Sequence, residues 1–131
     1  MNLILNVQPN KMNKNSYCVI MAGGLGKRFW PVSTKACPKQ FCDILNVGKS
    51  FLRQTFERAN QIFDTRNIFI VTGSAYEELT KQQIPEIPTE NILKEPFGKN
   101  TAPCVAYAAY RIARINPHAS MVVVPSDHFI T

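Results

Sequence analysis

The sequence predicts an α/β fold in which a mostly parallel sheet lies between two layers of helices. Short apolar runs rich in β-branched side chains alternate with longer segments whose apolar residues recur at helical spacing. Buried parallel strands have this continuous apolar character, and helical crossovers connect them. The alternation therefore predicts a sheet that is covered on both faces and joined by right-handed connections.

Four apolar runs are predicted as buried strands, at residues 17–21, 67–72, 91–94 and 121–124. Turn residues follow them, such as Gly73 after the second run and Pro125 after the fourth. Residues 1–15 are rich in Asn and Lys and show no periodicity, which predicts a disordered extension. Residues 16–131 then form a single domain.

Three helices are predicted between these strands. Ser50 caps the first, whose apolar face is made by Leu52, Phe56, Ala59, Ile62 and Phe63. The second begins at a capping box formed by Ser74 and Glu77 and runs to about residue 84, because Pro85 stops it. The third spans residues 102–115, with Val105, Ala109 and Ile112 facing inward.

The composition limits the class of partner. Fifteen Lys and Arg residues against 9 Asp and Glu give a net charge of +6, which favours an anionic partner. Because the basic residues are scattered, nucleic acid is disfavoured. The 4 cysteines form no Cys-x-x-Cys pair, and Cys18 and Cys104 are expected as small core residues. With no apolar run of bilayer length and no secretory signal, we expect a cytoplasmic protein without a membrane partner.

A glycine-rich turn follows the first predicted strand. Gly23, Gly24 and Gly26 are followed by Arg28, and Lys39 comes about ten residues later. Glycines let several backbone N–H groups approach a ligand and form a concavity that binds anions. Arginine adds a planar fork that suits phosphate oxygens. The stretch predicts a polyphosphate site, and an ordinary strand-to-helix turn with a basic surface is the alternative.

Two commoner glycine motifs do not fit this turn. The dinucleotide fingerprint requires a third glycine at the position of Phe29. The phosphate-binding P-loop requires Ser or Thr at the position of Arg28. A second partial match, which ends at Ser50, has Asp43 in place of its first glycine. Both motifs are therefore excluded.

Three blocks of sequence resemble the signatures of sugar-nucleotide pyrophosphorylases, most closely of the guanylyltransferases that act on mannose 1-phosphate. They are AGGLGKRFWP at 22–31 with PKQF at 38–41, EPFGKNTAP at 95–103, and VPSDH at 124–128. A small departure is Lys99, where the family has Arg. The resemblance covers residues 17–131 and implies the N-terminal part of a nucleotidyltransferase domain. The implied fold is a truncated, Rossmann-like three-layer sandwich of the nucleotide-diphospho-sugar transferase type.

The resemblance implies an enzyme that forms GDP-mannose and pyrophosphate from GTP and mannose 1-phosphate, with Mg²⁺ as cofactor. Its implied catalytic residues are Arg28, Lys39 and Asp127, and Asp127 is also the expected metal ligand because Mg²⁺ prefers carboxylate oxygens. The implied nucleotide-binding residues are Ala22, Gly23, Gly24, Gly26, Lys27, Arg28, Lys39, Asn100 and Thr101.

Simpler roles remain open for several of these residues. Lys39 can be a surface lysine, Asp127 can cap the segment that follows it, and Asn100 and Thr101 can cap the helix that begins there. However, all three blocks follow predicted strands. The carboxyl ends of parallel strands share one edge of a sheet, where ligands bind in such folds. This shared position favours a binding site.

The resemblance also implies that a second metal ligand and the sugar-binding residues come after residue 131. We therefore expect the chain to be inactive alone, and a non-catalytic nucleotide-binding or regulatory module is the alternative. An uncovered edge beside the last predicted strand favours association, so that a homo-oligomer is a further expectation.

Overall fold

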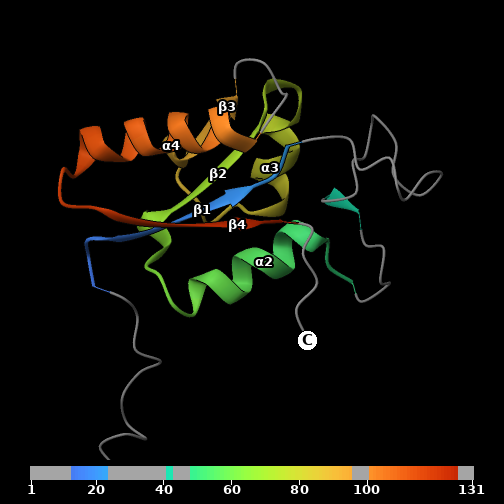
Figure 1. Cartoon of the computed structure of the whole chain (residues 1–131). Coiled ribbons are helices and arrows are strands. Elements are labelled where there is room, and N and C mark those ends of the chain that lie inside the picture. Colours follow the sequence, from blue (N-terminus) through green and yellow to red (C-terminus); the bar gives the residue numbers. More distant parts are fainter. Residues whose placement is uncertain (1–12, 24–40, 43–47, 96–100, 127–131) are drawn as a thin grey trace, which may run out of the picture.

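The structure is a computed structural model, and it describes residues 13–23, 41–42, 48–95 and 101–126 (Figure 1). In chain order the strands and helices are β1 (Ser16–Met21), α2 (Phe51–Asn60), β2 (Ile68–Gly73), α3 (Glu77–Gln83), β3 (Ile92–Glu95), α4 (Thr101–Ile115) and β4 (Ser120–Pro125). Short 3-10 helices precede β2, α3 and β3. The predicted alternation of strands and helices is confirmed, with strand ends displaced by one residue.

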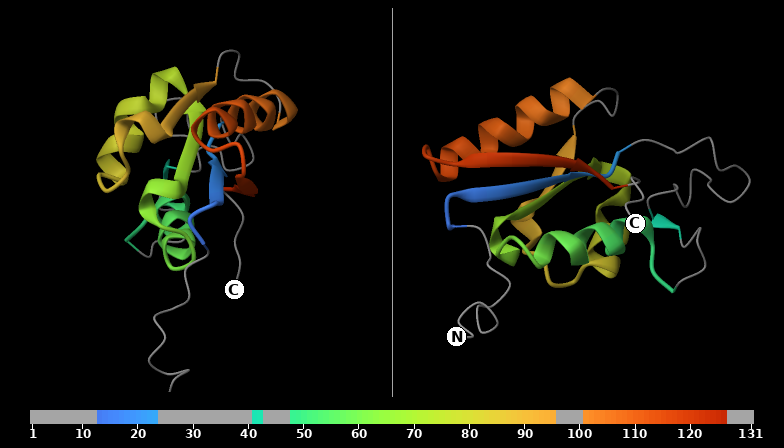
Figure 2. Two further views of the ribbon diagram at one scale, coloured as in Figure 1. Left: turned by 90° about the vertical axis from the view of Figure 1, so that its left-hand side faces the viewer. Right: turned by 60° about the horizontal axis from the view of Figure 1, so that its bottom comes forward.

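The strands form a parallel sheet in the order β3-β2-β1-β4. Helices α2 and α3 cover one face and α4 covers the other, as Figures 1 and 2 show. Alternate residues of β1 enter the two cores: Ile20 packs on the α2 and α3 side, and Val19 packs on the α4 side. Both are fully buried. The predicted three-layer α/β architecture is therefore confirmed.

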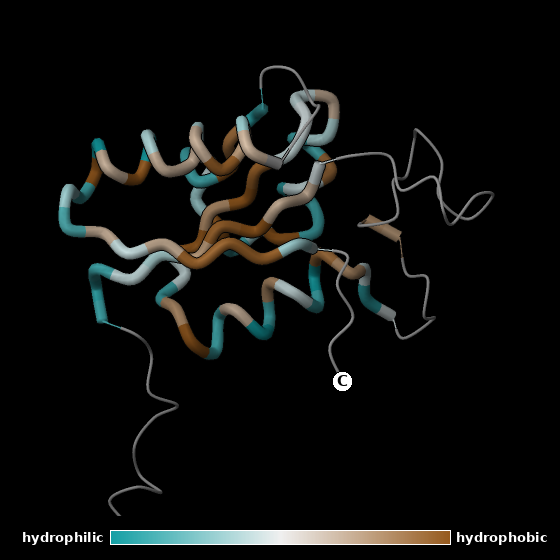
Figure 3. Tube along the Cα trace, in the orientation of Figure 1, coloured by the Kyte–Doolittle hydropathy of each residue, from teal (hydrophilic) through white to brown (hydrophobic). Residues whose placement is uncertain are grey.

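The hydropathy of the chain follows these layers. In Figure 3 the strands are mostly hydrophobic, whereas the helices alternate between apolar and hydrophilic residues. A single apolar stripe on each helix is sufficient to cover one face of a sheet. Among the described residues, no helix combines the length and the apolar character that a membrane crossing requires.

Helix α2 forms as predicted at its start but ends earlier than its apolar pattern suggests. The Ser50 hydroxyl accepts a hydrogen bond from Arg53 N at 3.1 Å, which confirms the cap. The helix ends at Asn60, and Ile62 is 47% exposed. The prediction that Ile62 faces the core is therefore wrong, because the chain turns after residue 60 and only Phe63 folds back into the core.

The predicted capping box at the start of α3 is wrong. Residues Ser74–Tyr76 form a 3-10 helix, α3 begins at Glu77, and no side chain caps either helix. Tyr76 packs against the core, with its ring centroid 5.7 Å from that of Phe41. This packing fixes the turn after β2, so that tertiary contacts determine where α3 begins.

Helix α4 packs through a face different from the one that its apolar pattern predicts. Cys104, Ala108 and Ile112 are buried, while Ala109 is exposed and Val105 is only partly buried. The prediction was right for Ile112, wrong for Ala109 and only partly right for Val105. In an alanine-rich helix both faces have apolar residues at helical spacing, so the pattern alone does not identify the buried one.

Candidate functional site

The structure describes the framework of the predicted site. Ala22 and Gly23 directly follow β1, and Thr101 is the first residue of α4. The other predicted site residues lie outside the described residues: Gly24, Gly26, Lys27, Arg28, Lys39, Asn100 and Asp127. Most of the described residues that flank these segments lie at the carboxyl ends of the strands or at the start of α4.

Ala22 is fixed between β1 and β2. Its N–H donates to the Val71 carbonyl at 2.8 Å, and its own carbonyl accepts from the Thr72 hydroxyl at 3.1 Å. Ala22 and Thr72 are both fully buried. Gly23 is exposed at the end of this anchored segment. The sheet thus sets the point at which the glycine-rich segment begins.

Ser126 is fixed between β1 and α2 in a similar way. Its N–H donates to the Met21 carbonyl at 3.0 Å, and its carbonyl accepts from the Thr55 hydroxyl at 3.2 Å. Because Ser126 is the residue before Asp127, these bonds place the origin of that segment beside the end of β1. The sequence prediction missed Thr55, although a hydroxyl among the apolar positions of α2 was a visible signal.

Glu95, the last residue of β3, contacts the residues that follow β1 and the start of α4. The Cys104 thiol, in the first turns of α4, donates to Glu95 Oε2. The other carboxylate oxygen, Oε1, lies 2.8 Å from the position that a Cβ atom on Gly23 would occupy. The side chain of Glu95 therefore extends from the edge strand β3 to the segment that follows the central strand β1.

The thiol of Cys104 remains protonated at neutral pH. Burial raises its pKa to about 12, and the hydrogen bond to Glu95 and the charge of that group contribute in the same direction. A protonated thiol is a donor, which agrees with its bond to Glu95. The sequence prediction treated Cys104 as a core residue only. Its position one turn into the helix after Glu95 was the signal for this contact.

A polar network holds the backbone of Phe41, which comes two residues after Lys39 in the sequence. The Phe41 carbonyl accepts from Gln83 Nε2 at 3.0 Å, and Gln83 Oε1 accepts from the Ser50 hydroxyl at 2.6 Å. Arg53 donates to both oxygens of Glu86 at 2.7 Å. Most of these residues line a hollow of about 330 Å³ beside the start of α2. The network connects Phe41 to the N-terminal cap of α2 and to the last residue of α3.

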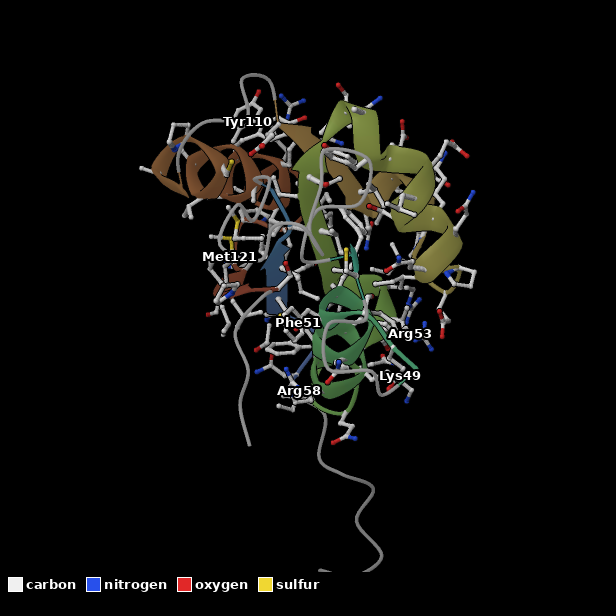
Figure 4. The ribbon with its side chains drawn as sticks, turned by 90° about the vertical axis from the view of Figure 1, so that its right-hand side faces the viewer. Lys49, Phe51, Arg53, Arg58, Tyr110 and Met121 are labelled. Carbon is white, nitrogen blue, oxygen red and sulfur yellow. The ribbon has the colours of Figure 1, made fainter. Side chains whose placement is uncertain are left out.

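The cations of this network are neutralised. Arg53 also bonds to Glu57, and Lys49 lies 2.7 Å from the same carboxylate. The Lys49 hydrogen bond is the main cause that lowers the pKa of Glu57, and the Arg53 hydrogen bond lowers the pKa of Glu86. Figure 4 shows Lys49 and Arg53 at the start of α2. Within the described residues, both charges are therefore engaged by carboxylates.

The described residues contain no group of three or more His, Cys, Asp or Glu side chains that could hold a metal ion. Among the described residues, the Glu95 carboxylate at the carboxyl edge is an oxygen group of the type that Mg²⁺ prefers. The donor chemistry thus fits a magnesium ion bound jointly with substrate oxygens.

Comparison with known proteins gives a consistent result. The profile of the nucleotidyl transferase family matches residues 17–131. A mannose-1-phosphate guanylyltransferase of Escherichia coli is 34% identical over 114 residues, and the alginate biosynthesis protein AlgA of Pseudomonas putida is 37% identical over 115 residues. Each alignment covers 86% of this chain, but only 24% and 23% of the two relatives. The chain thus spans about a quarter of the length of these relatives.

A solved structure agrees with the fold. The crystal structure titled mannose-1-phosphate geranyltransferase, from Thermus thermophilus, matches with a TM-score of 0.74 and 28% identity. The match covers 88% of this chain and 33% of that chain. The shared fold, the matching profile and the convergence of strand ends on one edge lead to one assignment: this chain belongs to the nucleotidyl transferase family.

Proposed function

We propose that the chain forms the nucleotide-binding part of an enzyme that makes GDP-mannose and pyrophosphate from GTP and mannose 1-phosphate. The observation that carries this proposal is the convergence at the carboxyl edge. The side chain of Glu95, at the end of β3, lies against Gly23, which follows β1. Ser126, which follows β4, donates from its backbone N–H to the carbonyl of Met21 at the end of β1, and its own carbonyl accepts from Thr55. The names of the relatives supply the choice of GTP and mannose 1-phosphate.

In the proposed reaction, an oxygen of the sugar phosphate attacks the α-phosphorus of the nucleotide, and pyrophosphate leaves. Catalysis of such a step is mostly positioning and neutralisation of charge. Backbone N–H groups of Gly23, Gly24 and Gly26 would hold the triphosphate. Arg28 would neutralise the charge that develops on the departing pyrophosphate, and Lys39 would contact the phosphates at the reacting centre.

Asp127 would hold a magnesium ion, which would supply positive charge to the phosphates. The bonds of Ser126 to Met21 and Thr55 support this role, because they fix the backbone directly before Asp127. Asn100 and Thr101 would contact the base or the ribose at the start of α4.

We further propose that these 131 residues bind nucleotide without turnover, because the relatives are about four times longer and the proposal assigns no sugar-binding residue to this chain. The test is a calorimetric titration of the chain with GTP and Mg²⁺, together with an assay for GDP-mannose. GTP binding that Arg28→Ala weakens would support the proposal. Arg66→Ala is the matched control, since Arg66 is 83% exposed and follows Asp64 at the opposite end of β2.

Three results would contradict this proposal in whole or in part. If the folded chain binds no nucleotide, the polyphosphate site is absent. If Arg28→Ala and Arg66→Ala weaken GTP binding equally, the effect comes from general charge and not from a site. Efficient GDP-mannose formation by the chain alone would refute the absence of turnover while supporting the reaction itself.

A further inference from the structure

Helix α4 carries two equivalent pairs of tyrosine and arginine on one flank, which we call the Tyr–Arg patch: Tyr107, Tyr110, Arg111 and Arg114. Arg111 Nη1 donates to the Tyr107 hydroxyl at 3.1 Å, and Arg114 Nη1 donates to the Tyr110 hydroxyl at 2.9 Å. Each guanidinium also lies over the ring of its tyrosine, 5.9 and 5.7 Å from the ring centroids. The tyrosines therefore hold both guanidinium groups in defined positions, one turn apart along the helix.

The charge of the Tyr–Arg patch is not neutralised by the described residues. Residues 101–126, which include α4 and β4, contain no Asp or Glu. On the other helical layer Arg53 pairs with Glu86, whereas Arg111 and Arg114 have no carboxylate within ion-pair distance in the described ranges. A guanidinium has five N–H donors in a planar fork, and the tyrosine hydroxyl accepts from one nitrogen only. Both arginines can therefore bind an external acceptor.

An apolar stripe lies beside these arginines. Ala106, Tyr110 and Ala113 recur at helical spacing and are exposed, and the exposed fraction of Tyr110 is 58%. Figure 4 shows Tyr110 on the side of α4 that faces away from the sheet. Arg114, in the last turn, also interacts favourably with the helix dipole. Stabilisation of the helix in this way does not require an exposed apolar stripe, whereas a surface that packs against another molecule does.

We propose that this face of α4 binds an acidic amphipathic helix of a partner protein. Apolar side chains of that helix would pack on Ala106, Tyr110 and Ala113, where the small alanines permit a close approach. Two carboxylates of the partner, one turn apart, would accept hydrogen bonds from Arg111 and Arg114. The spacing matches, because side chains three or four residues apart on any helix lie about 5–6 Å apart at Cβ.

The composition of the patch favours a protein over a nucleic acid or a membrane. Nucleic-acid surfaces gather many Lys and Arg side chains, because each phosphate contact adds to the affinity. Helix α4 has two arginines and no lysine. A helix that lies on a membrane inserts its main apolar face, but in α4 that face is buried against the sheet through Cys104, Ala108 and Ile112. Tyrosine and arginine are the residue types enriched in the cores of protein interfaces.

The position of the patch separates it from the proposed nucleotide site. Helix α4 begins at Thr101, after the carboxyl end of β3, and Arg114 lies about 20 Å further along the helix axis. The arginines are thus near the end of α4 that precedes β4, at the opposite edge of the sheet (Figure 1). Binding of the partner helix therefore goes beyond the proposed function and does not depend on it.

The test is a fluorescence anisotropy titration of the 131-residue chain into a labelled, hydrocarbon-stapled helical peptide. The peptide has leucines along one stripe and two glutamates, three residues apart, beside that stripe. In the matched peptide both glutamates are glutamines. Hydrogen bonds to charged groups correspond to roughly tenfold or more in affinity. We expect the acidic peptide to bind, and the glutamine peptide to bind at least about tenfold more weakly.

Two double variants locate this binding on α4. We expect Arg111→Gln with Arg114→Gln to weaken the acidic peptide at least about tenfold, because both forks are removed. Arg58→Gln with Arg66→Gln is the matched control, since it removes two cations that lie outside α4, and it should leave the affinity unchanged. Circular dichroism spectra check that each variant is folded. The two peptides compared on the unmodified chain decide the role of charge even if a variant unfolds.

Several outcomes would overturn the proposal. If the folded chain does not bind the acidic peptide, or binds the glutamine peptide equally well, the patch does not recognise an acidic helix. Equal weakening by the two double variants would show a general effect of charge. If a short DNA duplex or phosphatidylglycerol vesicles bind more tightly than the peptide, with the same dependence on Arg111 and Arg114, the patch binds phosphate groups and the protein partner is refuted.

Discussion

Gly23 and Glu95 are in contact across the carboxyl edge of the sheet, although they belong to segments that follow β1 and end β3. A Cβ atom on Gly23 would lie 2.8 Å from Glu95 Oε1, a distance that requires one of the two to move. The close contact explains why a glycine suits position 23 here: a larger residue would displace the carboxylate.

The first prediction is that Gly23→Ala weakens nucleotide binding more than it weakens the fold. Because the contact is with the end of a flexible side chain, Glu95 can rotate away, and we expect the free energy of unfolding to change by less than ~1 kcal/mol. Rotation of Glu95 breaks its bond with Cys104, and we expect GTP affinity to fall several-fold. Urea unfolding and calorimetric titration measure the two effects.

The matched control for this variant is Gly73→Ala. Gly73 ends β2 at the same edge, but a Cβ atom there meets only Tyr76 at an ordinary 3.5 Å. Its φ of −69° suits alanine, so the variant should be neutral or more stable by up to ~1 kcal/mol. Equal loss of GTP binding in both variants would contradict a specific role for the contact between Gly23 and Glu95.

The second prediction concerns alkaline pH. Burial raises the pKa of Cys18 and of Cys104 to about 12, above the ordinary value of 9.0. Between these values the unfolded thiol has lost its proton and the folded thiol has kept it, so stability falls as pH rises. Each thiol contributes up to about 1.4 kcal/mol per pH unit in this range.

Urea unfolding of the unmodified chain and of Cys104→Ser at pH 7.5 and pH 9.5 tests this prediction. Serine keeps a hydroxyl donor for Glu95 but does not titrate in this range. We expect the variant to lose less stability than the unmodified chain between the two pH values. Equal losses would mean that the Cys104 thiol ionises in the folded chain as easily as in the unfolded one.

The third prediction concerns Arg53, which connects α2 to the segment after α3. Its guanidinium bonds to Glu57, Glu86 and the Gln83 carbonyl. We expect Arg53→Ala to reduce the free energy of unfolding by ~1 kcal/mol, because the bidentate contact is partly exposed and surface ion pairs are weak. Arg66→Ala is the control, and it should have no measurable effect, since Arg66 and Asp64 are both well exposed.

The effect of Arg53→Ala should also depend on pH. Its contacts lower the pKa of Glu86 and contribute to lowering the pKa of Glu57, so both carboxylates are paired above their unfolded pKa and lose this stabilisation as pH falls. The difference between Arg53→Ala and the unmodified chain should therefore shrink between pH 7 and pH 3.5. A difference that stays constant would show that packing of Arg53 over the Phe56 ring dominates.

The sequence was sufficient to predict the layers of this fold because β1 and β2 are continuously apolar and their helices have clear stripes. It was not sufficient where two faces of a helix are equally apolar, as with Cys104 and Ala109 in α4. It also missed contacts that depend on strand order, such as that between Glu95 and Gly23. These two residues lie two strand positions apart in the sheet and far apart in the sequence. They become neighbours only when the sheet is assembled.

The last prediction concerns the edge strand β4. Val122 on β4 is 44% exposed and Ile62 after α2 is 47% exposed, and both line an almost entirely apolar hollow of about 290 Å³. On its outer side β4 has no paired strand among the described residues. Exposed strand edges and apolar patches favour association between chains. We therefore expect the isolated chain to self-associate as its concentration rises.

Val122→Lys should suppress this association, because a charge in the hollow must be desolvated when the surface is covered. Sedimentation velocity over a range of concentrations measures the effect. Ile115→Lys is the control: Ile115 is 60% exposed but lies at the end of α4, outside the hollow. If both lysine variants reduce association equally, the cause is added net charge. If neither does, the β4 edge is not the surface through which the chains meet.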